Sequence, residues 1–244
     1  MSTGPRAGFF ESAVQKLFMR RAHVDAVDDL NAQFRMITLS GDGLKGADWT
    51  PGDKVQIQLK LGSWVKRTYT PLHWDPIEGR TRVLVYLHGD GPGTAWARGT
   101  RAGDTCLLFG PRKSIDLRRL PPPAVLFGDE TSIGLAAALH ATRGDTHGIE
   151  LLFEFSAPSQ TVQVTEALGL SKAQYCGRSD GDGRAPDLER RLLSLVDAHH
   201  PIRFALTGKS TSIQQIRQLL RTRGFSPSQF QSRAYWAPGK SGLD

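Results

Sequence analysis

Residues 67–70 read Arg-Thr-Tyr-Thr, and residues 88–97 read His-Gly-Asp-Gly-Pro-Gly-Thr-Ala-Trp-Ala. In the first stretch, Arg67 supplies a rigid fork of donors for a pyrophosphate. Tyr69 shares a strand face with Arg67 and offers a ring for stacking, and Thr70 adds a hydroxyl group. In the second stretch, a glycine-rich turn precedes a short helix, whose free backbone N–H groups and dipole favour a phosphate. Together the two stretches predict a flavin site.

Three further motifs follow in order along the chain. Residues 110–112 read Gly-Pro-Arg, residues 128–131 read Gly-Asp-Glu-Thr, and residues 235–236 read Tyr-Trp, with a glycine at 239. With the first two stretches, this ordered set resembles the siderophore-interacting proteins, which are flavoprotein ferric-siderophore reductases of the ferredoxin-reductase-like group. The resemblance extends over nearly the whole chain.

The resemblance implies FAD and NAD(P)H as cofactors and a ferric siderophore as substrate. Tyr69 and Thr70 are then the expected catalytic residues, with Thr70 orienting the reactive edge of the flavin. The expected cofactor-binding residues are Arg67, Tyr69, Thr70, Val85, His88, Gly91, Pro92, Gly93, Thr94, Gly128, Asp129, Thr131 and Trp236. The expected substrate-binding cations are Lys60, Lys66, Arg112 and Arg233, with Lys113 and Lys240 as further candidates. In such chemistry the protein supplies binding, orientation and electrostatics.

The first half of the chain has the pattern of short strands separated by turns. Residues 54–61 alternate polar and apolar side chains, which is typical of a half-buried strand. Further strands are expected at residues 34–40, 83–88 and 105–109. An antiparallel β-barrel is the natural closure of this set. Residues 10–21 fit either a small amphipathic helix or an extended lead-in.

Residues 121–123 are three consecutive prolines, which cannot continue a helix or a central strand. We expect the domain boundary there, with a flavin-binding barrel over residues 1–120. Residues 121–244 would form an NAD(P)H-binding α/β domain whose C-terminal tail returns to the flavin. In it, strands at 124–127, 149–155 and 202–206 alternate with helices at 131–142, 187–198 and 210–223. That alternation predicts a parallel sheet.

Two stretches of the second half leave their role open. The motif at residues 128–131 follows a strand and opens a helix, where parallel sheets bind dinucleotides. Asp129 or Thr131 could equally cap the helix, and the two roles are compatible. Residues 207–210 resemble the end of a phosphate loop, but Arg203 stands where that loop needs glycine. Lys209 stands where the resemblance leads us to expect an acidic residue.

Loops and scattered polar residues complete the expectations. Residues 177–187 are polar and glycine-rich and are expected to form a mobile surface loop. Residues 156–160 are expected to form another loop, which lacks the arginine that would bind the 2′-phosphate of NADPH. Asp25, Asp28 and Asp29 are expected at a hairpin turn. The histidines at 140, 147, 199 and 200 have no spacing for a shared metal, so no metal site is expected.

Composition narrows the function classes. The formal charge of +7 and a pI near 9.7 favour an anionic partner. The basic residues are scattered without a nucleic-acid-binding motif, so nucleic acid is not an expected partner. With no apolar run of about 18 residues and no signal-like start, we expect a cytoplasmic protein without membrane insertion. Two cysteines are too few for an iron–sulfur cluster.

Alternatives to the siderophore reductase remain. One is a flavin reductase or diaphorase that passes electrons to a partner protein, and another is a siderophore-binding protein without turnover. The sequence leaves open the siderophore, the choice between NADH and NADPH, and the oligomeric state.

Overall fold

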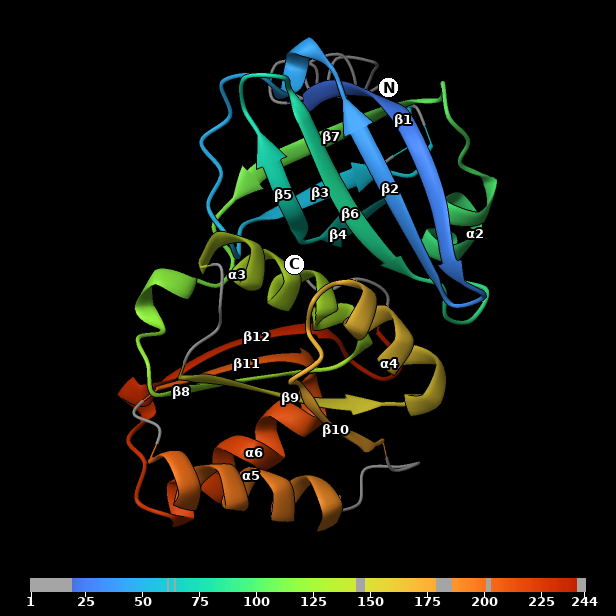
Figure 1. Cartoon of the computed structure of the whole chain (residues 1–244). Helices are drawn as coiled ribbons and strands as arrows, with labels where there is room; N and C mark the ends of the chain where they lie inside the picture. Colours follow the sequence, from blue (N-terminus) through green and yellow to red (C-terminus); the bar gives the residue numbers. More distant parts are fainter. Residues whose placement is uncertain are drawn as a thin grey trace, which may run out of the picture.

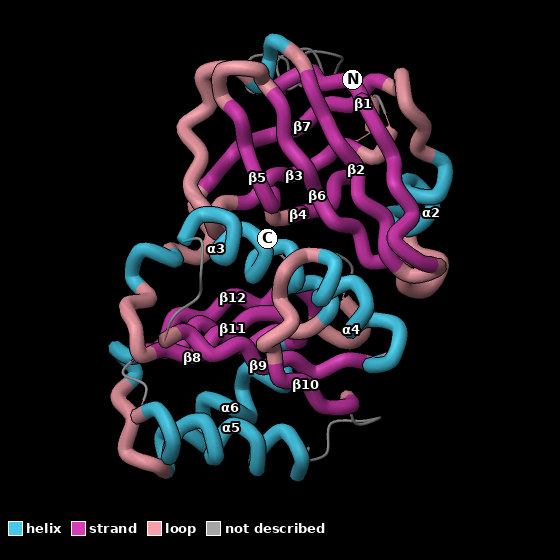
Figure 2. Tube along the Cα trace, viewed as in Figure 1, coloured by secondary structure: helices cyan, strands magenta, loops and turns pink. Residues whose placement is uncertain are grey.

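The computed structural model describes residues 19–60, 62–63, 65–143, 148–178, 186–200 and 203–240. Several expectations fall outside these residues: those for residues 10–18, for Leu61, His147 and Ile202, and for 179–185 within the expected loop. The described part contains one antiparallel and one parallel β-sheet, with helices on both faces of the second (Figure 1, Figure 2).

The first sheet has seven antiparallel strands in the order β4-β3-β7-β1-β2-β6-β5. Its edges are β4 and β5, yet only Thr70 separates them in sequence, so the sheet must curl until the edges approach each other at this residue. Within the described ranges no hydrogen-bonded ladder joins β4 to β5, so the sheet is barrel-like and not closed. The strands are β1 (Met19–Asn31), β2 (Phe34–Ser40), β3 (Lys54–Gln58), β4 (Lys66–Tyr69), β5 (Pro71–Asp75), β6 (Arg80–Tyr86) and β7 (Thr105–Arg112).

The longest connections of this sheet are residues 41–53, between β2 and β3, and residues 87–104, between β6 and β7. The latter connection contains the helix α2 (Pro92–Gly99). Two 3-10 helices flank the sheet, η1 (Asp42–Leu44) after β2 and η2 (Leu117–Arg119) after β7. The glycine-rich turn of the sequence therefore leads into a helix at the rim of the curled sheet.

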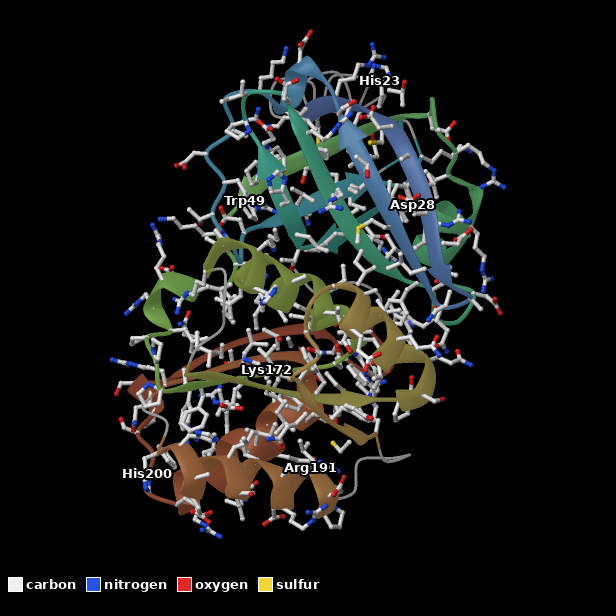
Figure 3. All side chains as sticks on the ribbon, viewed as in Figure 1. His23, Asp28, Trp49, Lys172, Arg191 and His200 are labelled. Carbon is white, nitrogen blue, oxygen red and sulfur yellow. The ribbon has the colours of Figure 1, made fainter. Side chains whose placement is uncertain are left out.

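The strand β1 corrects one expectation. The hairpin turn predicted at Asp25, Asp28 and Asp29 is wrong, because all three residues lie within β1, on which Figure 3 shows Asp28. Residues 21–25 alternate between exposed and buried side chains, and β1 pairs with both β2 and β7. This pairing outweighs the low strand propensity of aspartate. The turn follows at residues 32–33.

The second sheet has five parallel strands in the order β10-β9-β8-β11-β12. Helices α3 and α4 cover the face toward the barrel, and α5 and α6 cover the opposite face (Figure 1). The strands are β8 (Ala124–Gly128), β9 (Ile149–Phe155), β10 (Gln174–Gly177), β11 (Arg203–Lys209) and β12 (Phe230–Trp236). The helices are η3 (Glu130–Ser132), α3 (Ile133–Arg143), α4 (Pro158–Ala167), α5 (Pro186–His199), α6 (Ser210–Thr222) and η4 (Pro227–Gln229).

The predicted fold class, a flavin-type barrel followed by a parallel α/β sheet, is confirmed. Strands β2 and β9 match the predicted ranges residue for residue. The sequence missed α4, because Pro158 was taken as a loop residue although proline is favoured in the first turn of a helix. It also missed β10, which begins before the expected loop, and the edge strand β12.

Packing joins the two sheets. Phe34 of the barrel belongs to the same buried cluster as Leu126 of β8 and Leu135 of α3. Leu120, just before the three prolines, is fully buried in that cluster too. The division into residues 1–120 and 121–244 stays a prediction. None of the described helices is both long and apolar enough to cross a membrane.

Candidate functional site

A cavity of about 520 Å³ lies between the two sheets. Its walls come from β4 and Thr70, from β6, from the beginnings of α2 and of the η3–α3 segment, and from β12. The predicted site residues that line it are Arg67, Tyr69, Thr70, Val85, His88, Gly91, Pro92, Gly93, Thr94, Thr131, Arg233 and Trp236. Residues distant in sequence therefore meet at one site, and their individual roles stay predictions.

Arg67 and Tyr69 reach the beginning of α2 from the same side of β4. A Cβ atom on Gly93 would lie 3.2 Å from Arg67 Cγ and 3.5 Å from the Tyr69 hydroxyl. Gly93 thus allows the two side chains to pass close to the helix. The Tyr69 ring packs against Trp96, with ring centroids 5.9 Å apart. Burial raises the pKa of Tyr69, so its hydroxyl stays protonated and can donate a hydrogen bond.

The beginning of α2 has the features of a phosphate site. Gly91 is the N-cap and Pro92 the first helical residue, and the next backbone N–H groups have no acceptor within the helix. The Thr94 hydroxyl donates to the His88 carbonyl oxygen at 2.9 Å. This bond fixes the loop against the helix, so the backbone N–H groups rather than the Thr94 side chain are available for a phosphate.

A row of three rings leads from the buried Phe34 to the cavity wall, which Tyr86 and His88 line. The ring centroids of Phe34 and Tyr86 lie 5.0 Å apart, and those of Tyr86 and His88 lie 5.1 Å apart in a stacked arrangement. The Tyr86 hydroxyl is 2.9 Å from the Ser156 hydroxyl, which follows β9. The wall of the barrel is thereby hydrogen-bonded to the carboxyl end of the parallel sheet.

The motif at residues 128–131 fulfils its capping role. Asp129 is fully buried and accepts hydrogen bonds from the Thr131 backbone N–H at 2.9 Å and from its hydroxyl at 2.5 Å. It also accepts from Trp236 Nε1 at 2.7 Å. A Cβ on Gly128 would lie 2.3 Å from Ser132 Cβ, so glycine is required there by the close turn. Capping is confirmed, whereas contact of Gly128 and Asp129 with a nucleotide stays a prediction.

A buried ionic network lies at the carboxyl ends of β8, β9 and β10. Arg178 forms an ion pair with Glu130 and lies 3.9 Å from Asp129 and 3.7 Å from Glu154. Ser212 Oγ donates to Glu154 at 2.6 Å. Burial raises the pKa values of Asp129 and Glu154, although their hydrogen bonds and the charge of Arg178 oppose the rise. Burial of three carboxylates around one guanidinium carries a large desolvation cost, which the attraction between the carboxylates and the guanidinium must offset.

Trp236 connects this network to the cavity. Besides its bond to Asp129, its ring lies 5.4 Å from the Arg178 guanidinium and 5.9 Å from Lys209 Nζ. Lys209, which departs from the resemblance, is therefore buried between the end of β11 and the cavity wall. Its charge opposes the rise that burial causes in the pKa of Glu154.

The electrostatic character of the cavity is basic. Lys54, Arg67, Arg233 and Lys240 line it, and no aspartate or glutamate of the described residues does. Such a lining favours an anionic ligand. Among the other predicted cations, Lys60, Lys66, Arg112 and Lys113 lie outside the lining.

One of these cations is held elsewhere. The Arg112 Nη2 group donates to Gln56 at 2.7 Å, and its guanidinium lies 4.3 Å from the centroid of the Phe109 ring. The substrate role of Lys60, Lys66 and Arg112 stays a prediction. Within the described ranges, no three His, Cys, Asp or Glu side chains are grouped as in a metal site.

Sequence reasoning missed several residues of the site. Lys54, Tyr86 and Tyr235 line the cavity, and Glu130 and Arg178 form the buried network behind it. One signal was present, since Glu154 interrupts the apolar run at residues 151–155 of β9, and an unpaired charge is not stable in such a run.

Comparison with known proteins adds to this geometry. Residues 62–115 match the model of the siderophore-interacting FAD-binding domain. A siderophore utilization protein from T. fusca has a similar fold, with a TM-score of 0.69 and 20% identity over 93% of this chain and 95% of that chain. The siderophore-interacting protein SipS from Aeromonas hydrophila gives a TM-score of 0.71 and 18% identity, over 91% of this chain and 93% of that one.

A ferredoxin NADP+ reductase from Neisseria gonorrhoeae, solved with bound FAD and NADP, is similar as well. Its TM-score is 0.72 at 15% identity, over 90% of this chain and 99% of that chain. These structural similarities establish the fold. The match over residues 62–115 establishes a FAD-binding segment, which contains both motifs of the predicted flavin site. The predicted resemblance is therefore confirmed: the chain combines a segment that matches the siderophore-interacting FAD-binding domain with a fold like that of siderophore-interacting proteins and ferredoxin reductases.

Proposed function

We propose that the protein is an FAD-dependent oxidoreductase that reduces ferric siderophores with electrons from NAD(P)H and releases ferrous iron in the cytoplasm. One observation carries the proposal. The flavin motifs of the barrel, the helix start after β8 and the terminal strand β12 converge on a single cavity that is lined by four basic side chains. An anionic cofactor and an anionic chelate both suit such a lining.

The residues present fit FAD. Arg67 supplies donors for a diphosphate, and the N–H groups at the start of α2 supply others. Tyr69 offers a protonated hydroxyl and a ring held by Trp96. Thr70 lies where the two edges of the barrel-like sheet approach each other, at the centre of the cavity wall. FAD, when bound, accepts a hydride and passes electrons on singly.

The position of the parallel sheet supports a nicotinamide nucleotide. Open parallel sheets bind dinucleotides at the carboxyl ends of their strands. Here Thr131, after β8, and Gly134, in the first turn of α3, line the same cavity as the flavin motifs. The Neisseria reductase, which holds both FAD and NADP, has this arrangement of sheets. The nucleotide and the flavin would therefore meet between the two sheets.

Cations at the rim are expected to attract the chelate. Arg233 and Lys240 line the cavity next to Trp236. Opposite charges raise the rate of encounter, and the effect is screened over roughly 8 to 10 Å at ordinary salt. A triply anionic ferric catecholate should then be reduced faster than a neutral ferric hydroxamate, and only the anionic chelate should lose rate as salt rises.

The proposal is tested with purified holoprotein under anaerobic conditions. Each nicotinamide is added, flavin bleaching is followed by absorbance, and ferrous iron is measured with a chromogenic trap. Arg233→Gln should slow reduction of the anionic chelate and leave flavin bleaching unchanged, whereas Arg82→Gln, an exposed residue of β6, should change neither. Rapid bleaching without ferrous iron from either chelate would point instead to a reductase with a protein acceptor.

A further inference from the structure

Tyr235 occupies an irregular position in β12. The register of β11 and β12 pairs Gly208 with Ala234 and then Lys209 with Trp236, so Tyr235 is an extra residue on its strand. Side chains of a regular strand alternate between its two faces. Here residues 233–236 all contribute to the cavity lining. An extra residue of this kind is a β-bulge, and bulges often redirect a side chain next to a functional site.

The hydroxyl group of Tyr235 is buried and makes no hydrogen bond of regular geometry with any described residue, although the Thr70 side chain lies close enough to interact with it. Burial raises the pKa of Tyr235 to about 12, and the nearby Thr70 hydroxyl offsets part of the rise. The phenol therefore stays protonated at neutral pH and is a hydrogen-bond donor. Buried polar groups are nearly always satisfied, and an acceptor outside the protein is one explanation for an exception that lies in a cavity.

Several elements enclose the space around Thr70, beside which the phenol lies. A Cβ on Gly134 of α3 would lie 3.1 Å from the Thr70 carbonyl oxygen, so α3 packs directly against this residue. Tyr69 and Trp236, which flank Thr70 and Tyr235 in sequence, line the cavity as well. A ligand that reaches Thr70 from the cavity thus comes within reach of the Tyr235 hydroxyl.

We propose that the Tyr235 hydroxyl donates a hydrogen bond to an acceptor on the FAD ring, at the edge beside Thr70. The inference rests on the proposal that the cavity binds FAD. It assigns to Tyr235 a binding role that goes beyond the flavin motifs of the barrel and beyond the expected role of Trp236. Ring nitrogens and carbonyl oxygens are the acceptors available to such a donor.

The test compares Tyr235→Phe with the full-length wild-type protein, in the apo form and with FAD. Removal of a donor that makes no regular hydrogen bond within the protein should leave the stability of the apoprotein to urea nearly unchanged. Loss of a hydrogen bond to the cofactor should raise the dissociation constant for FAD by about 3- to 10-fold. It should also shift the visible absorption band of bound FAD. Tyr175→Phe, a change at an exposed tyrosine of β10, should alter none of these quantities.

The outcomes separate the inference from the proposed function. If Tyr235→Phe binds FAD as tightly as the wild type and with the same spectrum, the hydrogen bond to the flavin does not exist. A less stable apoprotein with unchanged FAD affinity would show that the hydroxyl is structural. Failure of the wild type itself to bind FAD would overturn the proposed function and this inference together.

Discussion

Charged side chains are arranged differently in the two sheets. In the antiparallel sheet, Arg80 pairs with Asp25 at 2.7 Å, with 59% and 27% of the side chains exposed. Beside the parallel sheet, Asp129, Glu130 and Glu154 are 0–3% exposed around an Arg178 side chain that is 15% exposed. The Asp25–Arg80 pair is thus largely solvated, whereas the carboxylates around Arg178 are buried.

The difference shows that exposure to water determines how the same chemical groups affect pKa and stability. A hydrogen bond from Ser40 and the charge of Arg80 lower the pKa of Asp25, because burial there is slight. Burial raises the pKa of Asp129 in spite of its hydrogen bonds. Surface pairs contribute little to stability, whereas breaking a buried pair leaves a charge that water cannot reach. The buried network is therefore the more vulnerable of the two.

The largest effect is expected from Arg178→Ala. Removing the guanidinium leaves three buried carboxylates without their common partner, and breaking a buried pair costs roughly 3 to 5 kcal/mol. The free energy of unfolding, measured by urea denaturation, should fall by that order. Arg191→Ala is the matched control, since Arg191 forms an exposed pair with Asp187 at 3.0 Å. An equal loss of unfolding free energy in both variants would show that buried and surface charge pairs do not differ in their contribution to stability.

A smaller effect, on ligand affinity rather than folding, is expected from Arg67→Ala. Charged hydrogen bonds contribute ~1.5 to 3 kcal/mol, so the dissociation constant for FAD should rise by about 10-fold or more. Stability of the apoprotein should change little, because Arg67 is only half-buried at the cavity. Arg82→Ala provides the control on the exposed face of the same sheet. Unchanged FAD retention in Arg67→Ala would contradict the assignment of the flavin site.

The variant Asp129→Asn should change how stability depends on pH. The folded-state pKa of Asp129 lies above its ordinary value of 3.8. The protonated form of this group therefore stabilises the folded protein fully below about pH 4, and this stabilisation is lost as pH rises through the raised pKa. Because asparagine does not titrate, the free energy of unfolding should decline less between pH 4 and 8 in the variant than in the wild type. Parallel curves for the two proteins would show that Asp129 ionises normally.

Asp187 provides a control, because its pKa is shifted in the opposite direction. The hydrogen bond from Arg191 lowers the pKa of this exposed carboxylate. Its contribution to stability is present above the ordinary pKa of aspartate and is lost as pH falls through the lowered pKa. Asp187→Asn should therefore flatten the acid side of the stability curve and leave the neutral side unchanged.

The smallest effect is expected from Arg80→Ala. An exposed ion pair contributes about 1 kcal/mol or less, and salt on the order of 1 M screens most of it. Urea denaturation at low and high salt should show a small loss at low salt that shrinks at high salt. A loss as large as that of Arg178→Ala would mean that exposure does not distinguish the two regions.

Local motifs predicted the barrel side of the site, because their geometry depends on neighbouring residues. Arg67 and Tyr69 share one strand, and Gly91 to Thr94 form one helix start. The other wall depends on contacts between distant residues. Trp236 and Asp129 are 107 residues apart, and only the pairing of the parallel strands places them together.

The buried network was missed for a similar reason. Arg178 follows β10, a short strand that the sequence pattern did not reveal, and its partner Glu130 lies 48 residues earlier. Tyr235 depends on a register shift in β12, and the alternation rule cannot show such a shift from the sequence alone.

The place of β12 in the chain also affects when the cofactor site can form. Every barrel wall of the cavity is synthesised by residue 114, and the helix start of the parallel sheet by residue 134. Tyr235 and its neighbours emerge from the ribosome about a hundred residues later. A nascent chain can therefore fold its first sheet early but presents an incomplete cavity throughout most of its synthesis. Tight loading of FAD becomes a late event, which follows the pairing of β12 with β11.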